Sequence, residues 1–210
     1  MSVRIAPLLL TPALMLVLSG CLVDSTLDDK GGGTMKVELR GSATDTLSRV
    51  KARFTSDNSE ITSATMDDQK NAVVELKYKD FTKLNTLPQF KEINFSLTSD
   101  AKAKTKTASA TTKHDKPITF NDEQLAYFGK ELSVSITVPG EVVKTNGQAK
   151  DKTVTWKMPL NTYLSAPETL FSVTYKADVT AATAGTPAAG AAQDAAAAKD
   201  AKPAATPKKK

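Results

Sequence analysis

The chain has 210 residues, of which 40% are hydrophobic and 24% charged, with a formal net charge of +5. So small a charge gives no reason to expect a nucleic-acid partner, and a single cysteine excludes an internal disulfide. After residue 21 no apolar run approaches the roughly 20 residues that a membrane-spanning helix needs.

Residues 1–20 have the three-part layout of a secretory signal. Arg4 supplies the positive start, a mostly apolar run covers residues 5–18, and the small residues Ser19 and Gly20 follow. The apolar run is too short to span a bilayer as a helix. We therefore expect residues 1–20 to be a signal peptide that is removed.

The quartet Leu18-Ser19-Gly20-Cys21 resembles the bacterial lipobox. That resemblance implies a diacylglyceryl thioether on Cys21 and a further fatty acid, such as palmitate, on its amino group. Two acyl chains anchor a protein stably where one does so only marginally. We expect Cys21 to hold the protein to membrane lipid in the cell envelope, on the extracytoplasmic side, which excludes nucleic acid as a partner. Leu22 after the cysteine resembles outer-membrane lipoproteins, if the host has an outer membrane.

Both ends of the mature chain are poor in large apolar residues. Residues 21–33 finish in three glycines and predict a lipidated cysteine with a flexible tether, which would span roughly 20 Å. Residues 179–210 are rich in alanine, proline and lysine and predict a disordered tail. The remainder, residues 34–178, predicts one folded domain.

Several segments of this domain alternate apolar and polar residues, which is typical of strands buried on one face. They are residues 35–40, 72–78, 93–97, 132–138, 154–160 and 171–176. Asn146-Gly147 favours a hairpin turn that would join residues 132–144 to residues 153–160. Pro139-Gly140 interrupts the first arm of that hairpin and predicts a bulge or a sheet edge.

Helices are expected at three places, residues 44–54, 80–87 and 122–128. In the first, Leu47, Val50 and Phe54 have helical spacing, but Val50 and Phe54 also alternate with polar residues, so helix and strand both stay open. The predicted class is α+β: a mostly antiparallel sheet of about six to eight strands with one or two short helices packed on it.

The order Pro139-Gly140, Asn146-Gly147 and Trp156 resembles the bacterial lipoproteins that share the LppM domain. The resemblance covers about forty residues and the lipobox, and it implies a non-enzymatic envelope domain suspected of handling lipids or glycolipids. Members of that family often end in a membrane segment, whereas this chain ends in an Ala/Pro/Lys tail. The resemblance assigns no site residue.

Catalytic and metal-binding residue patterns are scarce. His114 is the single histidine and lies in a Lys-rich stretch, which predicts a solvated side chain rather than a zinc ligand or base. Asp67-Asp68 and Asp122-Glu123 lack calcium-loop spacing and predict turn or cap roles. We expect no enzyme activity, no cofactor and no metal.

Two basic features are candidates for binding anions. The first is a group of lysines that would line one face of a strand and continue beyond it, although they also suit an edge strand or a solvated loop. They are Lys102, Lys104, Lys106, Lys113 and Lys116. The second is the terminal Lys208-Lys209-Lys210, which is equally typical of a solubilising tail. Trp156 alternates in phase with apolar neighbours, so we expect it in the core, where it could also line a lipid cavity.

Two functions are consistent with these features. In the first, a membrane-anchored lipoprotein binds a lipid or glycolipid between its sheet and helices. In the second, a structural or assembly lipoprotein docks a protein partner or a cell-wall polymer through its basic tail.

Overall fold

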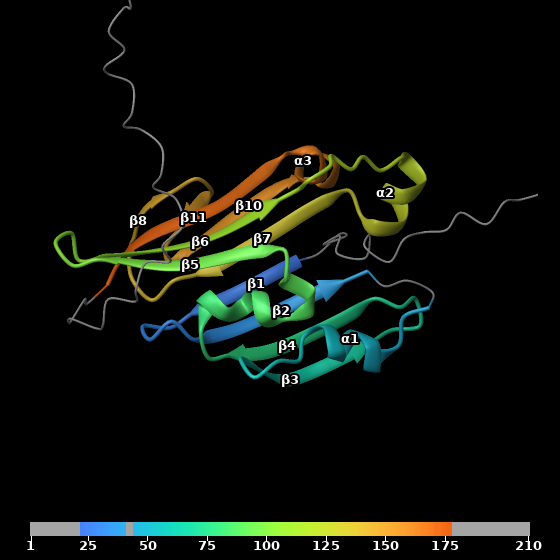
Figure 1. The fold of residues 1–210 in the computed structure, drawn as a ribbon, viewed down its shortest axis with the longest axis horizontal. Helices are drawn as coiled ribbons and strands as arrows, with labels where there is room; N and C mark the ends of the chain where they lie inside the picture. The colour runs from blue at the N-terminus through green and yellow to red at the C-terminus, as the bar shows by residue number, and fades with distance from the viewer. Residues whose placement is uncertain (1–21, 41–43, 178–210) are drawn as a thin grey trace, which may run out of the picture. The chain divides into compact units, whose positions relative to one another are not determined.

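A computed structural model describes residues 22–40 and 44–177, which fold into two β-sheets stacked face to face (Figure 1). The larger sheet has seven strands in the order β3-β4-β2-β1-β7-β10-β9, and the smaller has four in the order β5-β6-β11-β8. Neighbouring strands are antiparallel except for β1 and β7, which are parallel. The predicted α+β class is confirmed, with the strands divided between two sheets.

The bounds of the elements follow the chain. The strands of the larger sheet are β1 (Leu22–Leu27), β2 (Gly33–Leu39), β3 (Ser59–Met66), β4 (Ala72–Tyr78), β7 (Glu131–Thr137), β9 (Gln148–Lys150) and β10 (Thr153–Pro159). Those of the smaller sheet are β5 (Ile93–Asp100), β6 (Thr105–Lys113), β8 (Val142–Thr145) and β11 (Glu168–Lys176). The helices are α1 (Leu47–Arg53), η2 (Phe81–Thr86), η3 (Pro88–Phe90), α2 (Asp122–Phe128) and α3 (Leu160–Ser165).

All three predicted helices are present, and each begins at a capping side chain. Thr46 accepts from the backbone N–H of Arg49 at the start of α1, and Asp80 caps the 3₁₀ helix η2 in the same way. Asn121 forms a capping box with Gln124 at the start of α2. These caps satisfy backbone donors that have no partner within the helix. Because residues 47–53 form a helix, the alternative of a strand at residues 44–54 is wrong.

The predicted tether at residues 21–33 is wrong over its described part. Residues 22–27 form β1, which lies between β2 and β7 inside the larger sheet, and its side chains Val23 and Leu27 are buried. Gly31 and Gly32 belong to the tight β1–β2 connection, where Gly31 has a φ of 92°, and Gly33 is the first residue of β2. This short strand has too few large apolar residues for its alternation to be recognised in the sequence. Its stability comes from pairing with β2 on one side and β7 on the other.

The predicted hairpin is correct in its pairing and wrong in its turn. Strands β7 and β10 pair as expected, with Val134 opposite Trp156. However, the chain leaves the larger sheet after β7, crosses at Pro139-Gly140 into β8 of the smaller sheet, and returns through Asn146-Gly147 into β9. Both dipeptides therefore mark crossings between sheets, and the tight reversal before β10 falls at Asp151, whose φ is 54°. Of the two alternatives predicted at Pro139-Gly140, the sheet edge is correct, because the strand that follows, β8, is the edge strand of the smaller sheet.

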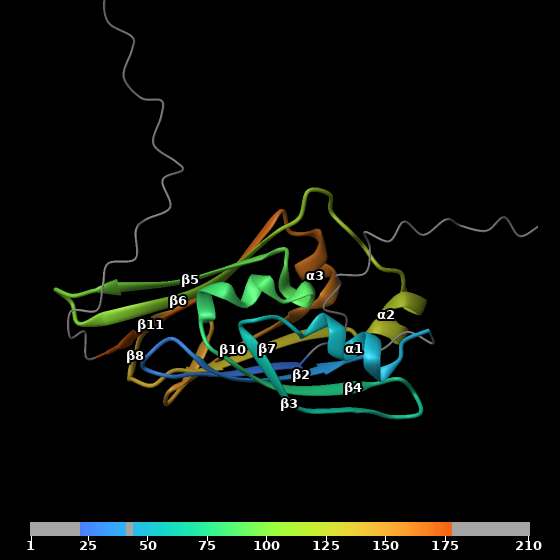
Figure 2. The ribbon, with the colours of Figure 1, turned by 60° about the horizontal axis from the view of Figure 1, so that its bottom comes forward.

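Helices α1, η2 and η3 fill the space between the sheets along the edge away from β8 and β9 (Figure 2). The side chains of Phe54, Leu84 and Leu87 are completely buried there. Phe90 contacts the rings of Phe54 and Phe95 edge to face, with centroids 5.9 and 6.0 Å apart. Such contacts add to the burial of apolar surface, so this edge of the two-sheet stack is closed by a packed wedge, residues 79–92 together with α1.

Candidate functional site: an apolar cavity between the sheets

A cavity of about 60 Å³ lies between the facing surfaces of the two sheets. Most of its lining is apolar, and four aromatic side chains contribute from the wedge and from both sheets: Phe81, Phe95, Trp156 and Phe171. The volume is well below the roughly 300 to 1,000 Å³ of preformed ligand pockets. Cavities of this kind stay dry and accept apolar groups, so an acyl chain would require the sheets to separate.

Ser25 of β1 is a polar residue of the cavity lining, beside Tyr78. The Ser25 hydroxyl lies 3.0 Å from the hydroxyl of Tyr78, which also donates to the Thr26 carbonyl at 3.1 Å. Burial raises the pKa of Tyr78 to about 12, so its phenol stays protonated and remains a donor. The Ser25–Tyr78 pair is therefore polar but carries no charge.

The sheet crossing holds Trp156 in the cavity wall. The Asn146 side-chain oxygen accepts from Trp156 Nε1 at 2.9 Å and from the Ser172 backbone N–H at 3.0 Å, and its amide nitrogen donates to the Leu170 carbonyl at 2.7 Å. A Cβ on Gly147 would lie 2.5 Å from Trp156 Nε1. The Asn-Gly dipeptide and the tryptophan are therefore one structural unit, and Trp156 is both a core and a cavity residue.

A second hollow of about 440 Å³ lies on the opposite, polar face of the larger sheet. Hydroxyl side chains dominate its lining, with Thr34, Thr137 and Thr153 among them, beside the charged Asp24 and Lys77. Here Lys36 and Glu38 form an ion pair at 2.8 Å, which raises the pKa of Lys36. The groups in this hollow can hydrogen-bond a polar molecule, and no aromatic side chain lines it.

The structure does not bring the five candidate lysines together. Lys102 and Lys104 lie in the β5–β6 turn rather than on a strand, because the chain reverses there and Lys104 has a φ of 53°. Lys106 donates to the Asp29 carbonyl at 2.7 Å. Lys113, at the far end of β6, pairs with Glu168 at 3.5 Å, and Lys116 lies in the loop beyond. The expected row of ammonium groups along one strand face is therefore wrong, since about 25 Å of strand separates the two ends.

His114 is half-buried instead of solvated. Its Nδ1 lies 3.0 Å from the Ala166 carbonyl, and its ring contacts Tyr163 edge to face at 5.1 Å between centroids. Asp67 accepts from the backbone and side-chain nitrogens of Asn71, which lowers its pKa, and thus has the predicted turn role. Within residues 22–40 and 44–177, no group of three or more His, Cys, Asp or Glu residues could hold a metal ion.

Several predictions fall outside the described residues: the signal peptide at 1–20, the lipidation of Cys21, and the tail with Lys208-Lys209-Lys210. Over the described part of the chain, none of the helices is long and apolar enough to cross a membrane.

The structure thus has two sheets around an apolar interior, and the chain crosses between them at Pro139-Gly140 and Asn146-Gly147. The family model of the LppM domain matches residues 26–167, more than half of the 210 residues, and the chain belongs to that family.

A solved structure, the NMR structure of the folded domain of Mycobacterium tuberculosis LppM, is similar over 75% of this chain and 88% of that chain. The two sequences are 13% identical, with a TM-score of 0.47. Among curated proteins, none matches the chain.

Sequence reasoning identified Trp156 as a cavity candidate but missed most of the other lining residues. Ala108 and Ala110 lie on β6, a strand of Thr, Ser, Ala and Lys without a large apolar residue. Ser25 lies on the unpredicted β1. In β6 the sequence shows only small residues alternating with polar ones, and this pattern is too weak to distinguish a strand from a loop.

Proposed function

We propose that this protein is a non-catalytic envelope lipoprotein, anchored through acyl chains on Cys21, whose domain binds a lipid or glycolipid by taking an acyl chain between its two sheets. The observation that carries the proposal is the aromatic-lined cavity between the sheets. Its apolar side chains meet the acyl chain, and the hydroxyls of Ser25 and Tyr78 beside the cavity are paired with each other and carry no charge.

Separation of the sheets is easier along one edge than along the other. At the β8–β9 edge the chain passes between sheets twice through short segments, and Asn146 hydrogen-bonds residues of both. At the opposite edge the link is the longer wedge, which hydrogen-bonds the larger-sheet side through Asp80 and Asn58 but meets Phe95 of β5 through ring contacts of Phe81 and Phe90. Residues packed only by apolar contacts can be replaced by another apolar group without leaving polar atoms unsatisfied. The acyl chain therefore enters beside η2 and β5.

Filling the cavity tests this proposal. Ala110 lies on β6 in the cavity wall, whereas its neighbour Thr111 points to the other face of the same strand. The full lipidated chain is purified from bacterial membranes in detergent and analysed by native mass spectrometry for lipid beyond the acyl groups on Cys21. Wild type and Thr111→Leu should retain that lipid, and Ala110→Leu should lose it by about tenfold, equivalent to 1.4 kcal/mol.

Retention of lipid by Ala110→Leu, or its absence from the wild type, would contradict binding in the cavity. The mass of a retained lipid separates a phospholipid from a glycolipid. Titration with a phospholipid that carries a fluorescent acyl chain provides the second measurement, and it should rank the three proteins in the same order.

A further inference from the structure

We infer that the domain lies directly on the bilayer, with the end of the larger sheet where β1 starts facing the lipid and Tyr127 at the membrane interface. This inference rests on the lipid anchor in the proposed function and adds the orientation of the domain. Its basis is the position of β1, together with the exposed aromatic side chain that lies beside its start.

No flexible tether separates the anchor from the sheet. Cys21 immediately precedes Leu22, the first residue of β1, and consecutive Cα atoms are about 3.8 Å apart. Leu22 is paired on both sides, with Glu38 of β2 and Ser133 of β7. An acylated sulfur at the membrane surface therefore holds the start of β1 within a few ångströms of the lipid headgroups.

The sheet register shows which other segments share this end. Strand β7, parallel to β1, starts here, and the antiparallel β2 and β10 end here. Leu39 of β2 pairs with Ala72, so the β3–β4 turn at residues 67–71 also lies at this end. The β1–β2 connection, with Lys30, lies at the opposite end.

Helix α2 lies at the membrane-facing end, just before β7. Arg40, two residues beyond the partner of Leu22, donates from Nη1 to the Ala126 carbonyl at 3.4 Å. Asn161 of α3 exchanges hydrogen bonds of 2.8 and 2.9 Å with the backbone of Phe120 in the loop before α2. Contacts with β2 and α3 therefore position the helix beside the start of β1.

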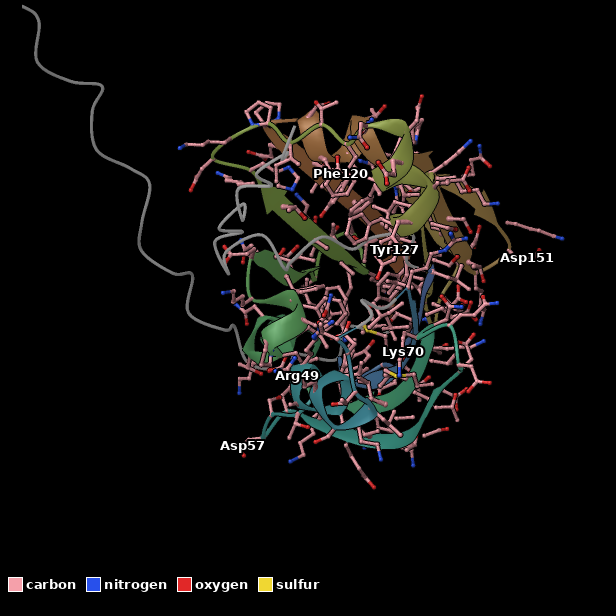
Figure 3. All side chains as sticks on the ribbon, turned by 90° about the vertical axis from the view of Figure 1, so that its right-hand side faces the viewer. Arg49, Asp57, Lys70, Phe120, Tyr127 and Asp151 are labelled. Carbon is pink, nitrogen blue, oxygen red and sulfur yellow. The ribbon has the colours of Figure 1, made fainter. Side chains whose placement is uncertain are left out.

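Three aromatic side chains lie together at α2, and one of them, Tyr127, is exposed. Tyr127 is 47% exposed, the ring of Phe128 contacts it edge to face at 4.9 Å between centroids, and Phe120 stacks on Phe128 at 5.0 Å. Figure 3 looks onto this end of the domain, with Tyr127, Lys70 and Arg49 on the near side. Tyrosine suits the boundary between headgroups and acyl chains because its ring is apolar and its hydroxyl remains hydrated.

Charge has little part in this contact. The basic residues Arg40, Arg49, Lys70 and Lys130 lie at this end, but so do the acidic Asp67, Asp68, Asp122 and Glu123. Since positive and negative side chains are mixed, the orientation should be the same on phosphatidylcholine vesicles as on vesicles that contain phosphatidylglycerol. A surface held by basic residues would instead need the anionic lipid.

Depth measurements on the lipidated full chain test the orientation. The single natural cysteine is Cys21, so once it is acylated an added cysteine carries the only thiol. Ala126→Cys places a fluorophore beside Tyr127 on the exposed side of α2, and Lys30→Cys places it on the exposed turn at the other end. Both proteins are reconstituted in vesicles of phosphatidylcholine with brominated acyl chains.

Bromine quenching should be at least about fivefold stronger at position 126 than at position 30, because an interfacial segment lies about 5 to 10 Å into the headgroup boundary. The charged variant Tyr127→Asp should reduce quenching at position 126 and leave position 30 unchanged. Equal quenching at the two positions, or stronger quenching at position 30, overturns the orientation.

The intact mass of the protein distinguishes a failure of the lipid anchor from a failure of the orientation. Acyl groups on Cys21 together with equal quenching refute the orientation and leave the anchor standing. A bare thiol on Cys21 refutes the anchor and the orientation together. Loss of cavity lipid from Ala110→Leu concerns the interior alone and should leave the quenching pattern unchanged.

Discussion

The two edges of the sheet stack are closed by different physical means. At the β8–β9 edge the chain crosses twice between sheets, and the side chain of Asn146 bonds Trp156, Ser172 and Leu170. At the wedge edge the hydrogen bonds, such as those between Asn58 and Asp80, run to the larger-sheet side, and the contacts with the smaller sheet are made by the rings of Phe81 and Phe90 against Phe95 of β5. Hydrogen bonds demand fixed geometry, whereas apolar packing is non-directional. The crossing edge therefore acts as the fixed side of the domain, and the wedge edge as the side that yields.

The largest expected effect is at the crossing. Trp156→Ala should lower the free energy of unfolding by about 4 kcal/mol, because it removes a buried indole and leaves a void between the sheets. Urea unfolding followed by circular dichroism measures the change. Trp156→Phe, which keeps a ring but removes the donor to Asn146, should cost only about 1 to 2 kcal/mol. Equal losses for the two variants would show that the hydrogen bond, and not the packing, holds this edge.

The wedge should respond through packing alone. Leu84→Ala should cost about 3 kcal/mol, since the side chain is completely buried between the sheets. Hydrogen exchange should show faster exchange in η2 and β5, with β8 and β9 unchanged. If β8 loses protection as much as η2, the distinction between a fixed and a yielding edge is wrong.

The Ser25–Tyr78 pair beside the cavity predicts a loss of stability at high pH. Burial raises the pKa of Tyr78 to about 12, above the ordinary value of 10.0. The unfolded state therefore loses its phenolic proton first, so the stabilisation is complete below pH 10 and disappears as pH rises towards 12. The loss is about 2 to 3 kcal/mol.

Tyr78→Phe is the matched control for this titration. It should be less stable than wild type at pH 8, where it lacks the hydrogen bonds to Ser25 and Thr26, and should show a shallower decline above pH 10. Urea midpoints at pH 8, 10 and 11 measure both. An unchanged slope would mean that Tyr78 is not the group that titrates.

The smallest effect is expected at the exposed ion pair next to the crossing. Glu141 and Lys176 lie 2.7 Å apart with side chains that are 70% and 63% exposed, and Lys176 lowers the pKa of Glu141. Exposed pairs contribute little because solvent screens them. Glu141→Gln should leave the urea midpoint at pH 7 unchanged, and a clear loss would show that charge helps to hold the crossing edge.

Sequence alone determined the features with a strong local signal. Alternation in β2, β4, β5, β7, β10 and β11 and the capping residues of α1, η2 and α2 predicted those elements, because period and capping are properties of neighbouring residues. The order of Pro139-Gly140, Asn146-Gly147 and Trp156, with the lipobox, indicated the family that the match over residues 26–167 establishes.

Only the tertiary structure decided the division into two sheets, the place of β1 and the cavity. Residues 22–27 and β6 have few large side chains, so their strand conformation depends on partners far along the chain. In isolation, Asn-Gly suits a hairpin turn. Here it joins strands of different sheets, and Gly147 lies so near the Trp156 ring that a Cβ would be 2.5 Å from Nε1. Pairing between distant segments is set by the shared burial of whole faces, which no local pattern records.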